Sequence, residues 1–289
     1  GIRALYQGAW GFAASADFTP AEIERTAQRA VEIARASHTL MKTPVKLADE
    51  PVHRDTVKTA FQVDPFTVSF EDKCALLLGV SEVLHKDKGI IRSSGSIWAQ
   101  RDIKHFASTE GSAIDFDLLA IGGGFSATAK GDGDFQSRDY SLPYRRAGYE
   151  HILAGKLLEN APRVAAQAIE KVGAKAPTPG KYDLVLDSAH LSLTIHESCG
   201  HPTELDRALG YEANYAGTSF LTPEKLGNFQ YGGKHINLIA DNTLAGGMAT
   251  TGYDDDGVAG QRWPIIEDGI FRGYSNNREV APQIGEKRS

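Results

Sequence analysis

The feature that most constrains the fold is a stretch of short strand-like runs between residues 89 and 140. Turn-forming residues punctuate the runs SIWAQRDIKHFAS, SAIDFDLLAIG and FSATAKGDGDFQSRDY. Runs of this kind are typical of antiparallel strands that follow one another across a sheet. We therefore expect an antiparallel meander in the middle of the chain.

A helix is predicted before the meander, from residue 19 to about residue 42. Thr19 is placed to act as its N-cap, and Pro20 occupies the first helical position. Glu22 follows three residues after the cap, which is the spacing of a capping box. These three residues together predict a well-defined helix start.

Other elements are expected on both sides of the meander. They are a hairpin over residues 2–14, an irregular connection over 43–66, a second helix from about Ser69 to Lys86, and a helical region over 143–174 with a break near NAPR. Helices that flank largely antiparallel strands indicate an α+β fold. We expect helices packed on mostly antiparallel sheets, in two to three subdomains.

The last third of the chain is predicted to be rich in strands. YDLVLD at residues 182–187 is expected to form a buried strand, and Asp268 with Gly269 to form a two-residue hairpin turn. The segment KAPTPGK at residues 175–181 is the best candidate for a domain boundary, because proline and glycine interrupt regular structure there.

One motif carries chemistry, the stretch TIHESCGHPTELD at residues 194–206. Zinc peptidases carry H-E-x-x-H on a helix, and this chain has H-E-x-x-x-H. A catalytic zinc needs neutral imidazoles, which His196 and His201 can supply, and a position left for water. A neighbouring carboxylate must accept the proton of that water, and Glu197 is the right residue type.

The additional residue between the two histidines requires a particular backbone conformation. In a regular helix, residues five apart point about 140° away from each other, so His196 and His201 would diverge. A π-type turn, with i→i+5 hydrogen bonds, brings such residues nearly into register. Pro202 cannot donate an amide and Gly200 tolerates unusual backbone angles, so we predict that the helix widens and ends here. The plainer alternative is that His196 packs in a core and His201 only ends a helix. Glu204 and Asp206 are possible partners that orient the imidazoles.

Charge and cysteine content limit the function. The net charge of −6 and the pI near 5.9 argue against a protein that binds nucleic acid. No apolar run approaches the roughly 18 residues that cross a bilayer. The two cysteines, Cys74 and Cys199, cannot form a disulfide framework, so we expect a cytoplasmic protein. Together with the charge and the absence of a long apolar run, this predicts a protein that binds neither nucleic acid nor membrane.

HESCGHPTELD is similar to the H-E-x-x-x-H-x-x-E-x-D segment of the TldD/PmbA family of metallopeptidases, on the TldD side. GIRALYQGAWGFAAS resembles the end of that family's first domain. YDLVLDSAHLSLTIHESCGH resembles the strand and helix that lead into its site, and YDDDGVAGQRWPIIEDGIFRGY resembles the hairpins after it. The resemblance covers essentially the whole chain and is loosest in the centre.

The resemblance implies a zinc-dependent peptidase that cleaves unfolded or extended peptides, with Zn²⁺ on His196 and His201 and Glu197 as general base on the zinc-bound water. It also implies a dimer, formed either by two like subunits or with a metal-free subunit of the TldE/PmbA type. It further implies a fragment that lacks both ends. The expected parts are residues 1–45 as the remnant of an N-terminal α/β domain, 46–176 as a middle α+β domain, and 177–289 as the start of a β-rich C-terminal domain that carries the motif.

The third zinc ligand of this family is a cysteine far downstream, and no position in this chain matches it. Cys199, His235, Glu204 and Asp206 are the substitutes that the chain offers. An inactive or metal-free fragment of an active parent is therefore one alternative. A second is a non-catalytic partner or regulatory subunit, although an intact H-E-x-x-x-H argues against it. A DNA-directed role is disfavoured by the net charge.

Overall fold

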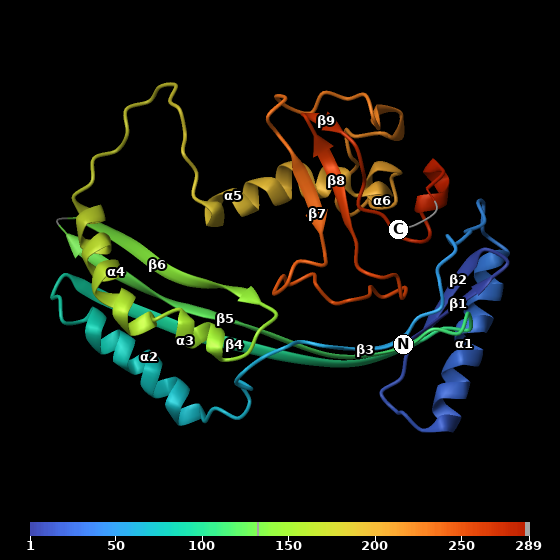
Figure 1. Cartoon of the computed structure of the whole chain (residues 1–289), viewed down its shortest axis with the longest axis horizontal. Helices are drawn as coiled ribbons and strands as arrows, with labels where there is room; N and C mark the ends of the chain where they lie inside the picture. The colour runs from blue at the N-terminus through green and yellow to red at the C-terminus, as the bar shows by residue number, and fades with distance from the viewer. Residues whose placement is uncertain (132, 287–289) are drawn as a thin grey trace. The chain divides into compact units, whose positions relative to one another are not determined.

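The computed structural model describes residues 1–131 and 133–286 and shows an α+β fold, as predicted (Figure 1). The chain forms two compact units. Unit 1 comprises Gly1–Pro51, Ala189–Leu238 and Ile265–Ser289, and unit 2 comprises Val52–Ser188 and Ile239–Pro264. Whether the three segments inferred from the sequence are separate domains stays a prediction.

Unit 1 begins with the predicted hairpin. Strand β1 (Ile2–Tyr6) pairs antiparallel with β2 (Ala9–Ala13). Gln7 and Gly8 form the turn with φ values of 48° and 88°, the left-handed geometry that tight hairpins need. Helix α1 (Pro20–His38) packs on the hairpin so closely that a Cβ at Gly11 would lie 2.0 Å from the carbonyl oxygen of Ala30. Glycine is therefore required at position 11.

The start of α1 was predicted correctly, but its capping box was wrong. Thr19 precedes the helix and its side chain makes no capping hydrogen bond. The Thr19 amide instead donates to Asp17, at 2.8 Å, and the Glu22 carboxylate pairs with Arg25 rather than reaching back. The helix also ends at His38, earlier than expected.

The meander was predicted correctly and forms the sheet of unit 2. Strands β4 (Ile90–Ala107), β5 (Ala113–Gly131) and β6 (Asp134–Arg145) are antiparallel neighbours, with β5 in the centre. One strand was missed, β3 (Arg54–Lys58), which pairs parallel with the start of β5. Its sequence RDTVK is mostly exposed, so it lacks the apolar alternation that would have indicated a strand.

Helices α2 (Phe70–Leu84), α3 (Glu150–Ala154) and α4 (Leu157–Val172) accompany this sheet (Figure 1). Ser69 caps α2 as predicted, because its hydroxyl accepts from the Asp72 amide at 3.0 Å. The break between α3 and α4 lies at Gly155 and Lys156, not near NAPR. Lys156 adopts a left-handed conformation (φ 47°), which ends one helix and starts the next, whereas Pro162 stays inside α4.

Apolar side chains of α2, α3, α4, β4 and β5 form one core. Its fully or nearly fully buried members are Val80, Leu84, Ile90, Ile121, Phe125, Ala127, Ala129, Tyr149, Ile152, Leu157, Ala161, Val164, Ala165 and Ala168. A smaller cluster of buried residues in unit 1 consists of Leu205, Leu221, Phe271, Tyr274 and Val280.

The last part of the chain consists of short elements. They are α5 (Ser188–Ile195), a π turn (His196–Gly200), a 3₁₀ turn (His201–Thr203), α6 (Leu205–Ala208), 3₁₀ turns at Pro223–Lys225 and Ala281–Ile284, and strands β7 (Leu238–Asp241), β8 (Arg262–Glu267) and β9 (Ile270–Phe271). The strand order of the sheet is β7-β8-β9. Asp268 and Gly269 make the predicted hairpin turn between β8 and β9, with φ values of 49° and 76°.

The predicted buried strand YDLVLD is wrong. Residues 182–187 form no strand, and Leu184 and Val185 are 77% and 101% exposed. An apolar run becomes a buried strand only where another strand pairs with its backbone. Within residues 1–131 and 133–286, no strand pairs with this run. Helix α5, which follows it, likewise has no buried residue.

None of the helices in the described ranges is both long enough and apolar enough to cross a membrane.

Candidate metal centre

The motif lies where α5 widens into a π turn. The His201 amide donates to the His196 carbonyl, an i→i−5 hydrogen bond, so the widened turn predicted from the spacing is confirmed. Pro202 follows at once and the helix ends, as expected. The role expected for Gly200 was wrong, because its φ and ψ of −59° and −68° are right-handed values that other residues also adopt. The missing amide of Pro202 remains the feature that stops the α-helical ladder.

The π turn brings the two histidines together. The ring centroids of His196 and His201 lie 4.4 Å apart, with the rings at 82° to each other. Donor atoms of His196, Glu197 and His201 all lie within 4.8 Å of one another. The Nε2 atom of His196 lies 3.8 Å from Oε1 of Glu197. Zn²⁺ takes imidazole nitrogens as ligands, so the two histidines supply the donor type that such an ion needs.

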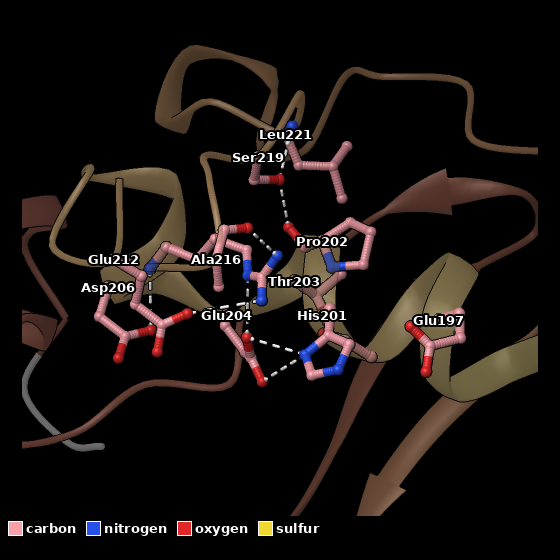
Figure 2. A network of polar contacts seen from close by, with 12 residues as sticks. Glu197, His201, Pro202, Thr203, Glu204, Asp206, Glu212, Ala216, Ser219 and Leu221 are labelled. Atoms are coloured by element: carbon pink, nitrogen blue, oxygen red, sulfur yellow. Dashed lines mark hydrogen bonds and ion pairs between the residues drawn. The ribbon is translucent and has the colours of Figure 1, made fainter. Parts of the chain in front are cut away.

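Glu204 fixes the orientation of His201. Its two carboxylate oxygens lie 3.1 and 3.2 Å from Nδ1 of His201, and Figure 2 shows Glu197 on the preceding turn of the ribbon, away from this contact. A carboxylate accepts hydrogen bonds, so Nδ1 carries the proton and Nε2 keeps the free lone pair that a metal needs. The expectation that Glu204 orients an imidazole agrees with this geometry.

Asp206 does not share this role. Its Oδ1 accepts from the amide of Arg207 at 2.9 Å, at the start of its own short helix α6. The prediction that it orients an imidazole was therefore wrong. Position 206 lies beyond the extended residue Glu204 (ψ 118°), which turns the chain away from the histidines.

Arg207 holds Glu204 from the other side. Its Nε donates to Oε2 of Glu204 at 3.2 Å, and its Nη2 lies 3.4 Å from Oε2 of Glu212. A further nitrogen, Nη1, donates to the carbonyl of Ala216 at 3.0 Å. The Arg207 side chain is only 16% exposed, so these contacts define its place. His201, Glu204, Arg207 and Glu212 thus form one connected polar chain.

Two hydroxyl groups that the sequence reading missed bind the carbonyls at the end of the π turn. Oγ1 of Thr203, which is fully buried, donates to the carbonyls of Cys199 and Gly200 at 2.7 and 2.9 Å. Oη of Tyr231 donates to the carbonyl of Ser198. Burial, together with a hydrogen bond to Cys199, raises the pKa of the Tyr231 phenol well above its usual value, so the phenol stays protonated and can donate. A hydroxyl residue directly after Pro202 was a usable signal for Thr203, whereas position 231 gave none.

Within the described ranges, no further possible ligand joins His196, Glu197 and His201. The only group of three possible ligands found there is His196, Glu197 and His201. Cys199, Glu204, Asp206 and His235, the substitutes considered from the sequence, stay outside it. Glu204 faces the Nδ1 side of His201, opposite to the nitrogen that remains free.

A hollow of about 430 Å³ lies elsewhere, on the sheet of unit 2. It is lined mainly by serines, glycines and Tyr144, and it contains neither histidine nor cysteine. Gly123 and Gly124 belong to this surface, where the pairing of β5 with β6 shifts register between Ile121 and Gly123. We place the candidate site at the π turn, because ligand chemistry is concentrated there and not at the hollow.

Comparison with known proteins gives two family matches. Residues 179–289 match the PmbA/TldA metallopeptidase C-terminal domain, and residues 1–34 match the PmbA/TldA metallopeptidase domain 1. A metalloprotease of Methanocaldococcus jannaschii is 28% identical over 286 residues, which are 98% of this chain and 60% of that protein. A zinc metalloprotease TldD homolog of Saccharolobus solfataricus is 24% identical over 99% of this chain and 59% of its own length. The chain thus spans about three fifths of the length of these relatives.

Solved structures show the same fold. A Thermotoga maritima protein described as a candidate modulator of a DNA gyrase superposes with a TM-score of 0.78 at 17% identity, over 99% of this chain and 61% of its own. TldE from Thermococcus kodakarensis superposes with a TM-score of 0.64 at 15% identity, with the same coverage of both chains. At these identities the likeness concerns the fold alone.

Proposed function

Because the chain belongs to the PmbA/TldD metallopeptidase family, we propose that it is a zinc-dependent peptidase that cleaves unfolded or extended peptides. The observation that carries this proposal is the π turn, which brings the donor atoms of His196, Glu197 and His201 within 4.8 Å of one another. A regular helix through the same six residues would separate the two imidazoles. An otherwise unfavourable backbone thus supports the donor set of a metal site.

In the proposed mechanism His196 and His201 hold the ion through ring nitrogens. Zn²⁺ at this place would lower the pKa of water and polarise a scissile carbonyl. Glu197 accepts the proton of the attacking water and passes it to the leaving amine. The Glu197 side chain is 59% exposed, so water and a peptide can reach it.

Glu204 acts through His201. By accepting a hydrogen bond from the Nδ1–H group, it keeps Nε2 available as a ligand and makes the imidazole a stronger metal ligand. Arg207 in turn holds the carboxylate in place. These two residues therefore set the position and tautomer of His201 without touching the substrate.

Location and partners belong to the same proposal. We place the protein in the cytoplasm, as a dimer of like subunits or with a subunit of the TldE/PmbA type, a pairing supported by the fold likeness to TldE. The net charge of −6 supports a peptide substrate over nucleic acid. A second candidate function is that of a non-catalytic partner subunit, because within the described ranges the two histidines share their donor cluster with Glu197 alone.

The test combines zinc analysis with a peptide-hydrolysis assay. We expect Glu197→Gln to keep its zinc and to lose at least about 100-fold in kcat, because it removes the base alone. Glu71→Gln, at an exposed site in the first turn of α2, is the matched control and should retain full activity. His196→Ala should lose zinc. Undiminished cleavage by Glu197→Gln would remove this residue from the mechanism, and a zinc-free, inactive wild type would favour the partner-subunit function.

A further inference from the structure

The proline that ends the motif leaves one backbone carbonyl without its normal donor. In an α-helix the amide of residue 202 would donate to the carbonyl of Ser198, four residues earlier. Pro202 has no amide hydrogen, so it cannot make this bond. Tyr231 donates its hydroxyl to that same carbonyl. The phenol therefore replaces the hydrogen bond that proline removes.

Tyr231 is itself held by a fixed framework. Its amide donates to the carbonyl of Gly269 at 2.8 Å, in the turn between β8 and β9. The neighbouring residue Gln230 forms an isolated bridge with Ile270. The Tyr231 ring also lies 6.1 Å from the ring of Phe220, at an angle of 30°. The hydroxyl therefore reaches the π turn from a residue thirty-three positions later in the chain, which is held against the turn between β8 and β9.

The contact acts at the centre of the motif. Ser198 lies midway between His196 and His201, and its carbonyl belongs to the turn that the His201 amide closes onto the His196 carbonyl. Ser198 is exposed, so water can replace the phenol at this carbonyl, but only the phenol is a fixed donor that holds the carbonyl, and with it the turn, in one place. Thr203 holds the next two carbonyls in the same way. The two hydroxyls thus satisfy three successive carbonyls at the end of the helix.

We propose that Tyr231 is a positioning residue of the metal centre, which fixes the π turn through the Ser198 carbonyl and so keeps His196 and His201 close enough to share one ion. The proposal that Tyr231 holds the π turn concerns the backbone alone. The proposal that this hold affects metal binding rests on the proposed function. Tyr231 touches neither the donor atoms nor the scissile bond in this scheme.

The first experiment needs no metal. Amide hydrogen exchange of the metal-free full chain is followed by NMR for Tyr231→Phe, which removes only the hydroxyl. We expect exchange of the His201 amide to accelerate about fivefold, the effect of losing one hydrogen bond that holds the turn. Tyr274→Phe is the matched control, because its phenol also donates to a backbone carbonyl of unit 1, that of Leu221 at 2.6 Å. The control should leave the His201 amide unchanged.

The second experiment measures the zinc dissociation constant by competition with a chelator. We expect Tyr231→Phe to raise Kd about tenfold, in the range seen when an outer partner of a metal ligand is removed. Tyr274→Phe should bind zinc as the wild type does, even if its melting temperature falls equally.

The outcomes separate the two proposals. Equal His201 exchange in both variants overturns the positioning role, as does an unchanged zinc Kd in a Tyr231→Phe variant whose exchange is faster. If the wild-type protein binds no zinc, the proposed function is contradicted. If exchange of the His201 amide is nevertheless faster in Tyr231→Phe alone, the role of Tyr231 in holding the turn is supported.

Discussion

The sheet of unit 2 and the π-turn segment of unit 1 are held together by different forces. In unit 2, long strands and two long helices bury fourteen residues in one apolar cluster. Between residues 188 and 208, in contrast, no helical segment exceeds eight residues, and hydroxyls, carboxylates and a guanidinium bind backbone groups and one another. Burial of apolar side chains stabilises the sheet of unit 2, whereas hydrogen bonds to polar groups stabilise the π-turn segment.

This difference has a consequence for mutations. Loss of apolar volume in the sheet unit should lower the free energy of unfolding and leave metal binding unchanged in the folded protein. Loss of one polar contact near the π turn should change metal binding, alone or together with stability. The following changes test this separation.

The largest effect is expected for Leu84→Ala in α2. Leu84 is fully buried in the main apolar cluster, and truncation of such a leucine costs about 3 kcal/mol through lost burial and the cavity left behind. Leu78→Ala in the same helix is the control, because Leu78 is 63% exposed and its loss should cost little. Urea denaturation measures both, and zinc titration of the folded variants should show an unchanged Kd. Weakened zinc binding in folded Leu84→Ala would break the separation.

The second prediction concerns Glu204→Gln. The change removes the charged acceptor of the His201 Nδ1 proton, so zinc Kd should rise about 10- to 100-fold. Asp206→Asn serves as the control, because this carboxylate accepts from the Arg207 amide of its own helix and should leave Kd unchanged. Isothermal titration with Zn²⁺ provides the measurement. Equal zinc affinity in the two variants would contradict the role of Glu204.

A third, intermediate effect is expected for Thr203→Val. The change removes the hydroxyl of a fully buried residue, which donates to two carbonyls at the end of the π turn, and should cost about 2 kcal/mol. Thr67→Val is the matched control, because the Thr67 hydroxyl also donates to a backbone carbonyl, that of Asp64 at 2.8 Å, but is exposed. Thermal denaturation of both variants compares them. Similar losses at the two sites would mean that burial of the hydroxyl does not matter here.

The smallest effect is expected at the sheet surface, for Arg101→Gln. Nε and Nη2 of Arg101 both donate to the Asp117 carboxylate at 2.7 Å, and this hydrogen bonding lowers the pKa of Asp117. A lowered folded pKa means that the stabilisation is complete above the unfolded value, about 3.9, and is lost as the pH falls through the folded value. The stability difference between wild type and variant should therefore be present at pH 7 and shrink below pH 4. A difference that persists undiminished at pH 2 would contradict this account.

The sequence predicted the regular parts better than the irregular ones, for physical reasons. The meander and helix α2 carry their own signals, because each strand or helix face is written in local apolar periodicity and turn residues. The predictions for strand β3 and for the run YDLVLD were wrong in opposite ways. Local pattern does not report whether a partner strand is available, so an exposed polar strand was missed and an unpaired apolar run was taken for a strand.

At the candidate site, spacing alone was enough to predict the π turn, since two histidines five residues apart can meet in few other ways. Glu204 was found because it lies only three residues beyond His201, within reach along one helical turn. Tyr231 could not be found, because it lies thirty-three positions after Ser198 and is held there by the still later turn between β8 and β9. Roles of residues in ligand binding and catalysis remain predictions at every one of these positions.

The π turn also explains how the chain tolerates its extra residue. In a regular helix one additional residue advances every later position by about 100°, and the π turn absorbs this rotation by closing over five residues instead of four. Pro202 then ends the helix, and Glu204, with an extended ψ of 118°, precedes a separate helix, α6. The direction of the buried Leu205 on α6 is therefore independent of α5. Because the helix ends directly after the π turn, a one-residue change in the spacing of the histidines affects the motif and not the elements that follow it.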